Sequence, residues 1–151
     1  MQDQNKIERI RNLMDKWSIG TDIDSFKEAF NMSPRTNKVS NSTKGNRKNS
    51  KLATIGDAVI ELFVREELAS NDDSSAEISW EKQRYVSNED LKARAIALGL
   101  DKLEIFELNS QQSEDYASLL EAIVGWMFLN NHYKKCSQVL RDFIFKDMKL
   151  Y

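Results

Sequence analysis

Residues 52–62 have the sequence LATIGDAVIEL, an apolar run that carries one glycine and two carboxylates. Its apolar residues recur at helical spacing and predict a helix from about Leu52 to Ala69. Asp57 and Glu61 are four residues apart, so on this helix their side chains lie one turn apart on the same face. Beside them, an apolar stripe is expected to face the core, formed by Leu52, Ile55, Val59, Leu62 and Phe63.

A carboxylate pair at the margin of a buried stripe is costly to desolvate unless a cation or hydrogen-bond donors compensate it. Two interpretations follow for Asp57 and Glu61, a metal site or the solvated edge of an amphipathic helix. Cys136 and His132 are four residues apart and offer a nucleophile and a base, but nothing else near them indicates catalysis. A single cysteine excludes an intrachain disulfide.

The 151 residues are long enough to bury one sizeable core, so a single domain over residues 1–151 is expected. Hydrophobic residues make up 40% and charged residues 30%, which is typical of a soluble globular protein and argues against wholesale disorder. The first eleven residues are mostly polar, and no apolar run approaches the ~18 residues that a membrane span requires. An intracellular, cytoplasmic protein without a membrane partner is therefore expected.

Charge is nearly balanced, at a net −2, but it is unevenly placed. Between Ser33 and Leu52 there is no acidic residue, and six basic residues occur: Arg35, Lys38, Lys44, Arg47, Lys48 and Lys51. Asparagine, serine and threonine fill most of the remainder and predict a flexible basic loop at about 33–51. Such a loop is either a solvated connection or a phosphate-contacting segment of a nucleic-acid-binding protein.

The rest of the chain shows helical spacing, and an all-α fold is predicted. Ser79 is expected to cap one short helix and Ser87 the next, with Asp90 in its first turn. The predicted helices cover about 4–16, 22–30, 52–69, 79–84, 87–98, 113–129 and 133–148.

Three segments together resemble the ribonuclease III catalytic domain. Residues 52–62 resemble its signature helix, and residues 85–91, followed by Leu98-Gly99-Leu100, are similar to its middle helix. Residues 120–129, LEAIVGWMFL, are similar to its helix with the motif phe-glu-ala-leu-ile-gly. The three occur in the family's order and spacing, and they imply a helical bundle like the ribonuclease III endonuclease domain.

This resemblance implies metal-assisted hydrolysis of the phosphodiester backbone of double-stranded RNA, with carboxylates holding Mg²⁺ or Mn²⁺. Asp57 matches the aspartate after the signature glycine, and Glu121 matches the glutamate of the second metal-binding motif, so both are expected to be catalytic metal ligands. Glu61 is the third candidate catalytic residue. It either holds a metal-bound water or pairs with Arg65 one turn further on.

The sequence departs from the family pattern at two acidic positions, which are Ala53 and Ser118 here. A further acidic position falls near Ser75, with Glu77 close by. Alanine at position 53 and glutamate at position 61 resemble the Mini-III branch, which has no separate double-stranded-RNA-binding domain. Residues 108–115, however, are acidic and polar where that branch has a basic loop.

The family resemblance also implies a homodimer that pairs through the signature helix, although Thr54 replaces the aromatic residue often found there. The first functional hypothesis is a metal-dependent endonuclease that cleaves double-stranded or structured RNA. The alternative is a non-catalytic module that binds RNA or an RNA-processing or ribosomal partner. A third is a helical interaction domain with no RNA role.

Overall fold

The computed structural model describes residues 2–30, 50–70, 74–103 and 113–148, and every regular element within them is helical. The predicted all-α class is therefore confirmed. The elements are α1 (Gln2–Trp17), α2 (Ile23–Phe26), η1 (Lys27–Phe30), α3 (Ser50–Ala69), α4 (Ser75–Val86), α5 (Asn88–Ala97), η3 (Leu100–Leu103), α6 (Ser113–Asn130), α7 (Tyr133–Val139), η4 (Leu140–Ile144) and η5 (Lys146–Met148). Among these helices none combines the length and apolar character needed to cross a bilayer.

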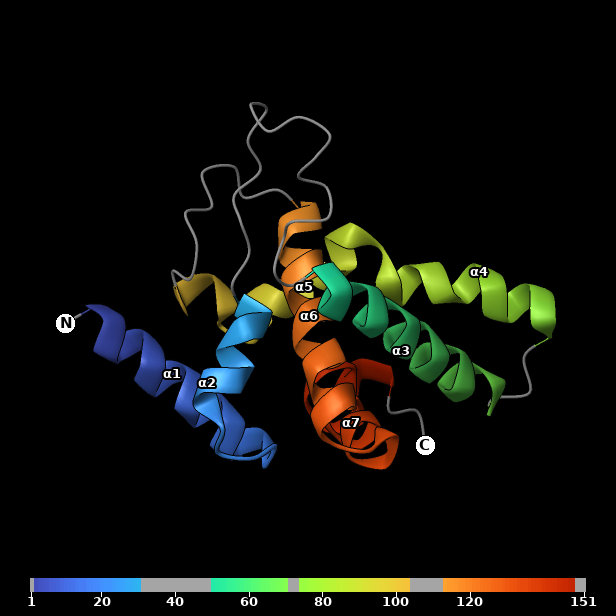
Figure 1. Cartoon of the computed structure of the whole chain (residues 1–151). Helices are drawn as coiled ribbons and strands as arrows, with labels where there is room; N and C mark the ends of the chain where they lie inside the picture. Colours follow the sequence, from blue (N-terminus) through green and yellow to red (C-terminus); the bar gives the residue numbers. More distant parts are fainter. Residues whose placement is uncertain (1, 31–49, 71–73, 104–112, 149–151) are drawn as a thin grey trace.

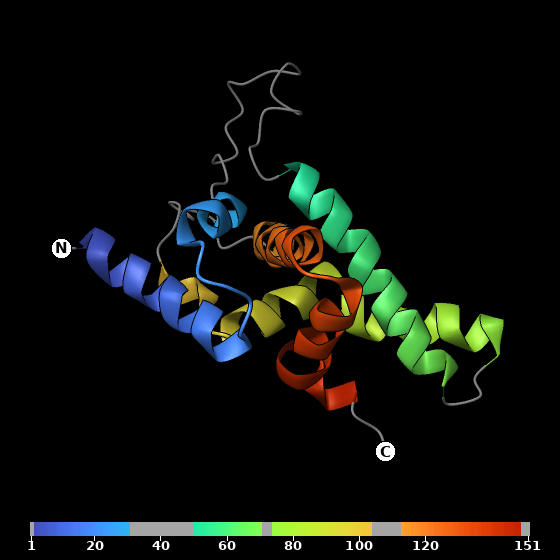
Figure 2. The same cartoon turned by 60° about the horizontal axis from the view of Figure 1, so that its bottom comes forward.

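Helix α6 is the central element of the bundle (Figure 1). Seen nearly end-on in Figure 2, it lies between α2 on one side and α3 on the other, with α7 folded back below it. A helix that is apolar on all sides is expected to be buried. That expectation holds for the buried α6 residues Tyr116, Ala117, Leu119, Leu120, Ala122, Ile123, Val124, Trp126 and Met127.

The crossing of α3 and α6 depends on two glycines. A Cβ placed on Gly56 would lie 1.7 Å from the carbonyl oxygen of Glu121, and one placed on Gly125 would lie 2.0 Å from that of Leu52. Real Cβ atoms do not approach an oxygen so closely, so the two helix backbones touch at a point where only glycine fits. Asp57 follows Gly56 directly, and Glu121 lies one turn before Gly125, so the crossing brings both carboxylates to one place.

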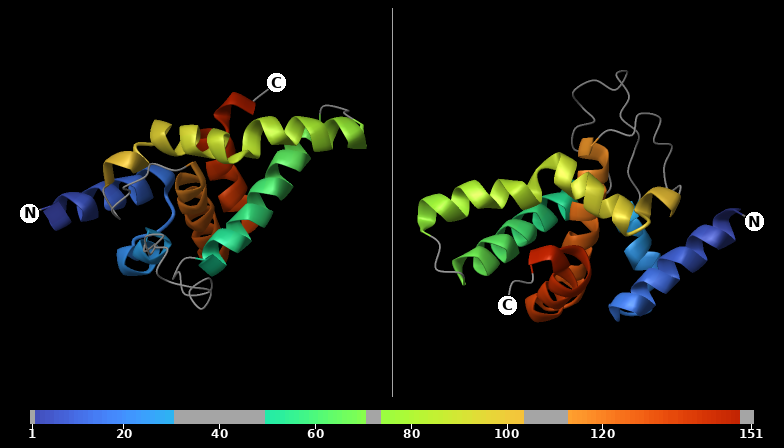
Figure 3. Two further views of the ribbon diagram at one scale, coloured as in Figure 1. Left: turned by 90° about the horizontal axis from the view of Figure 1, so that it is seen from above. Right: turned by 180° about the vertical axis from the view of Figure 1, so that it is seen from behind.

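Helices α4 and α5 follow one another along one side of the molecule, as both views in Figure 3 show. Ser87 joins them and caps α5 as predicted, because its hydroxyl accepts the backbone N–H of Asp90 at 3.1 Å. The predicted start of α4 at Ser79 is wrong. The helix begins at Ser75, and Ser74 and Glu77 form a reciprocal capping box at its N-terminus.

The predicted apolar stripe is wrong at Leu62, because the side of α3 that carries this residue is not buried and Leu62 is 50% exposed. The buried face of α3 is turned toward Ile60 and Val64, which were not assigned to the stripe, and it shares Val59 and Phe63 with it. The Gly56–Gly125 crossing sets this rotation: residues four and eight positions after Gly56 continue its face into the core.

The predicted single C-terminal helix over 133–148 is also wrong. It ends as an α-helix at Val139, widens into the π-helical η4 and closes with the short η5. Arg94 of α5 donates to the Ile144 carbonyl at 2.8 Å and forms a bidentate pair with Asp147, at 2.7 and 3.0 Å. This clasp satisfies a carbonyl at the end of η4 and ties the C-terminal elements to α5.

Candidate active site

Asp57 and Glu121 face each other across the α3–α6 crossing, within hydrogen-bonding reach. Asp57 is exposed and Glu121 is half-buried. Desolvation chiefly, then the hydrogen bond and the charge of Asp57, raises the pKa of Glu121 from 4.5 to about 8. The raised pKa favours the protonated form of Glu121, since a second bare carboxylate at this point would lie unpaired beside the first.

Two oxygen-rich side chains held together in this way fit a divalent cation such as Mg²⁺, which prefers carboxylate and water oxygens and can displace the proton. Among the residues that the structure describes, no group of three or more histidine, cysteine, aspartate or glutamate side chains is placed to share one metal ion. Ala53 and Ser118 occupy positions one turn before Asp57 and Glu121, where a longer acidic side chain would reach the same point. A cation here would take its remaining ligands from water and substrate oxygens.

Glu61 lies one turn after Asp57, and its carboxylate is held by Lys82 of α4 at 2.6 Å. The Lys82 side chain is only 17% exposed, so this ion pair is shielded more than a surface pair. The proposed pairing of Glu61 with Arg65 is therefore replaced by a pair with a residue 21 positions away. Glu77, the other acidic candidate, is engaged in the capping box of α4, where hydrogen bonds from Ser74 lower its pKa.

Comparison with known proteins identifies the chain's relationships. The family described as "Ribonuclease III domain" matches residues 50–132. This region is more than half of the chain and includes Asp57, Glu61 and Glu121. The chain belongs to the ribonuclease III domain family. The Mini-III branch within that family is not distinguished by this match.

Among curated proteins, this ribonuclease III domain is similar to "Ribonuclease 3" of Bdellovibrio bacteriovorus, at 34% identity over 104 residues that cover 64% of the chain and 43% of that protein. It is also similar to "Ribonuclease 3" of Bacteroides thetaiotaomicron, at 27% identity over 98 residues, covering 62% and 32%. The chain thus spans less than half the length of these relatives.

A solved structure supports the fold. The nuclease domain of ribonuclease III from Campylobacter jejuni matches with a TM-score of 0.75 and 18% identity, covering 93% of this chain and 99% of that one. That nuclease domain shows structural flexibility in a region involved in dimer formation. The likeness confirms the expected ribonuclease III-type helical bundle.

Of the six basic candidates for RNA contact, only Lys51 lies within the described residues, exposed in the first turn of α3. Most of the predicted loop at about 33–51 lies outside them, including Arg35, Lys38, Lys44, Arg47 and Lys48. For these residues, RNA contact remains a prediction.

Cys136 is not suited to act as a nucleophile in this domain. It is fully buried, and burial raises the pKa of its thiol to about 12. Its Sγ lies 3.9 Å from the Val124 carbonyl, whereas His132 is exposed at the start of α7.

Sequence reasoning missed Lys82. No local signal indicates it, because its role depends on how α4 packs against α3 rather than on spacing along one helix. The sequence offers one weak and non-local clue, which is that a lysine occurs on the helix following the one that carries Asp57 and Glu61.

Proposed function

We propose that this chain is a metal-dependent endonuclease that cleaves double-stranded or structured RNA, with Asp57 and Glu121 as ligands of Mg²⁺ or Mn²⁺. The observation that carries the proposal is the meeting of these two carboxylates at a glycine-lined helix crossing. Family membership supports it, because the matched region contains both residues. Fixed carboxylates of this kind suit hydrolysis of a phosphodiester, where negative charge develops on phosphate oxygens.

The bound ion would activate a water molecule and offset charge on the phosphate. The protein's own contribution is positional. Gly56 and Gly125 fix the distance between the helices, so Asp57 and Glu121 need little rearrangement to act together. Lys82 holds the Glu61 carboxylate one turn from Asp57, where it can accept a hydrogen bond from a metal-bound water.

The basic residues of the predicted loop, together with Lys51, would supply phosphate contacts. Binding through such contacts depends on the release of counterions, so affinity should fall steeply as salt increases. Residues 33–49 come directly before α3 in the sequence, and Lys51 lies in the first turn of the helix that carries Asp57. For residues 1–151 the proposed organisation is one ribonuclease III-like domain that includes this loop.

We also infer that the domain forms a homodimer through α3. Ala58 is exposed on this helix, and Leu62, one turn further on, is 50% exposed. Trp80 of the adjacent α4 is 71% exposed. Large apolar side chains exposed on neighbouring helices are typical of a protein interface.

Two finer points belong to the same proposal. Ala53 and Glu61 support a place in the Mini-III branch, and the cytoplasm is the expected location.

The test is to incubate the purified protein with an RNA duplex and Mg²⁺ or Mn²⁺, and to compare Asp57→Asn and Glu121→Gln with the parent protein. Glu28→Gln, an exposed glutamate of η1, is the matched control. We expect cleavage by the parent and the control only, with circular dichroism showing all four proteins folded. Cleavage by Asp57→Asn at the parent rate would refute the proposed site.

One observation favours the alternative, a non-catalytic RNA-binding module. Within the described ranges no third acidic side chain joins Asp57 and Glu121. This alternative would be established if the protein binds duplex RNA without added metal and does not cleave it with either Mg²⁺ or Mn²⁺ present.

A further inference from the structure

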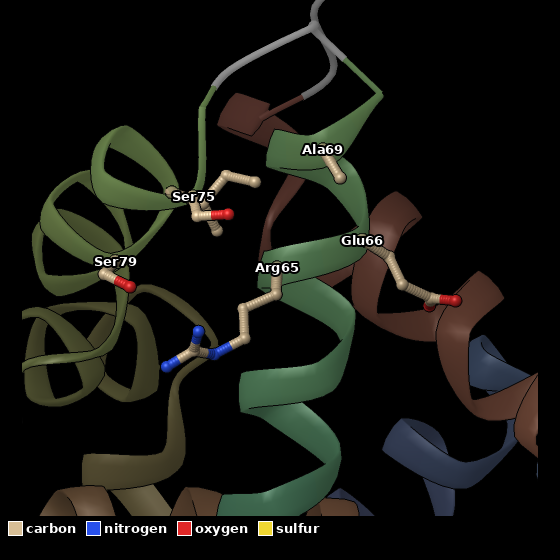
Figure 4. A pocket seen from close by; sticks show the side chains of 6 residues that line it. Arg65, Glu66, Ala69, Ser75 and Ser79 are labelled. Atoms are coloured by element: carbon tan, nitrogen blue, oxygen red, sulfur yellow. The ribbon is translucent and has the colours of Figure 1, made fainter.

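A pocket lies between α3 and α4, toward the end of α3 that is far from Asp57. Its volume is about 340 Å³, and it is lined by Arg65, Glu66, Ala69, Ser75, Ile78 and Ser79. Figure 4 shows the Arg65 guanidinium extending from α3 toward α4, and the hydroxyls of Ser75 and Ser79 directed from α4 toward α3. Three side chains with hydrogen-bond donors, from two helices, thus converge on one space.

The Arg65 guanidinium is available to bind a ligand. It makes no ion pair or hydrogen bond within the described part of the chain, whereas Arg94 pairs with Asp147, and Arg141 pairs with Glu67. A guanidinium that its own protein leaves without a partner can bind a planar or tetrahedral anion through two N–H groups.

Two acidic side chains among the described residues near the pocket, Glu66 and Glu77, are already engaged elsewhere. Glu66 lines it, but its carboxylate points to the other side of α3, where it accepts a hydrogen bond from the Tyr133 hydroxyl. Glu77 is bonded to the backbone N–H of Ser74 in the capping box. Of the two charged residues that line the pocket, Arg65 is therefore the one whose charged group is directed into it. Because the capping box occupies the helix end, the donors are side chains rather than free backbone groups of α4.

Position along α3 relates the pocket to the candidate active site. Asp57, Glu61 and Arg65 are successive residues at four-residue intervals, so a helical rise of about 1.5 Å per residue places Arg65 about 12 Å along the axis from Asp57. Where α3 lies along the duplex axis, this distance spans a few nucleotides of one strand. Lys82, paired with Glu61, lies between the two ends.

We propose that Arg65, Ser75 and Ser79 form a binding subsite for a backbone phosphate of the RNA, a few nucleotides from the phosphate held at Asp57 and Glu121. The guanidinium and the two hydroxyls bind the phosphate oxygens, and apolar atoms of the pocket wall contact the adjoining ribose. The subsite rests on the proposed function, since it presupposes RNA as the substrate. It positions the strand and does not take part in the chemical step.

The test measures binding of a labelled RNA duplex to the Asp57→Asn protein between about 50 and 200 mM salt, with and without Arg65→Ala. We expect Arg65→Ala to weaken binding about tenfold, as expected for loss of a charged hydrogen-bonding group, and to reduce the slope of log K against log salt by about one. Arg11→Ala, which removes the same charge from an exposed position on α1, is the matched control and should change both quantities much less. Replacing both Ser75 and Ser79 by alanine should weaken binding a few-fold and leave the salt slope unchanged.

The outcomes separate the two proposals. If the Asp57→Asn protein binds duplex RNA and Arg65→Ala behaves like Arg11→Ala, the subsite is refuted while the proposed function stands. If the Asp57→Asn protein binds no RNA at the lowest salt, both proposals fail. If Arg65→Ala dissociates a dimer on sedimentation and leaves RNA affinity per dimer unchanged, the pocket belongs to a protein interface and the subsite is again refuted. In the parent protein, Arg65→Ala should raise KM about tenfold and leave kcat unchanged.

Discussion

Replacing Gly56 by alanine tests whether backbone contact between α3 and α6 builds the site. The added Cβ would lie 1.7 Å from the Glu121 carbonyl oxygen and 2.9 Å from the Gly125 nitrogen. Both obstructing atoms belong to a helix backbone and cannot rotate away. The two helices must therefore separate by roughly 1 Å or more, which disturbs the packing of Ile60 and of the α6 face that it contacts.

The size of the effect follows from two opposing contributions. Overpacking of a core contact costs about 3 kcal/mol at the upper end of its usual range, and a rigid backbone obstacle places Gly56 there. Alanine is favoured over glycine inside a helix by about 1 kcal/mol, which offsets part of this cost. We expect a net loss of about 2 kcal/mol, or a fall in Tm of about 4–8 °C for a chain of this length. A misplacement of about 1 Å in a catalytic group can lower the rate on the order of 100-fold. The rate of RNA cleavage should therefore fall even at temperatures where the variant remains folded.

Thermal unfolding followed by circular dichroism gives the Tm, and cleavage of an RNA duplex at a temperature where both proteins are folded gives the rate. Ala93→Gly, at an exposed position within α5, calibrates the alanine–glycine difference in this protein and should lower stability by about 1 kcal/mol. A Gly56→Ala protein that is as stable as the parent or more stable, with the cleavage rate retained, would refute the proposed role of the crossing.

Three further predictions concern single side chains. Because Glu121 has its pKa raised to about 8, the folded protein holds a proton there that the unfolded chain releases above about pH 4.5, so stability without metal falls as pH rises toward 8. Glu121→Gln should therefore raise the Tm of the metal-free protein at pH 8 and remove its Mn²⁺-induced increase; a lower Tm at that pH would contradict the assignment. Arg94→Ala should cost about 2 kcal/mol in urea unfolding at pH 7, through loss of the pair with Asp147 and of the bond to a carbonyl. Since Arg94 lowers the pKa of Asp147, the stabilisation exists above that carboxyl's ordinary pKa and is lost as pH falls through its lowered value, so the deficit should shrink at pH 3. Leu62→Glu should raise the dimer dissociation constant at least tenfold in sedimentation experiments, whereas Leu129→Glu, at a similarly exposed leucine on α6, should not.

The helices could be predicted because their determinants are local or repeated at fixed spacing. The pairing of Asp57 with Glu121 followed instead from the resemblance to ribonuclease III, since spacing alone pointed to Asp57 and Glu61. The α3 run is long and periodic, the α6 run is long and apolar on nearly all sides, and Ser87 is a cap that acts within its own turn. The rotation of α3 could not be predicted from periodicity alone, which assigned Leu62 to the core. The side of a helix that is buried depends on where its neighbour crosses, and the Gly56–Gly125 contact fixes that point.

The long-range ion pairs escaped the sequence for a related reason. Glu61 had an apparent partner in Arg65 one turn away, but the packing of α4 presents Lys82 instead, 21 residues further along. At the end of the broken C-terminal helix, the Ile144 carbonyl accepts a hydrogen bond from Arg94, which lies 50 residues earlier. Neither choice leaves a signature in local composition, because each is decided by the approach of two helices.

The position of the carboxylate pair depends directly on the glycine crossing. Bringing two helix backbones into contact forces Asp57 and Glu121 together, and it also removes Glu121 partly from water, which raises the pKa of its carboxyl. The packing energy of α3 against α6 thus maintains an arrangement that the carboxylates alone would disfavour when both are charged. Under the proposed function, a divalent cation would relieve that electrostatic cost, and the crossing would hold both carboxylates in place before the ion binds. On this reasoning, a variant that loosens the crossing weakens metal binding even when both carboxylates are retained.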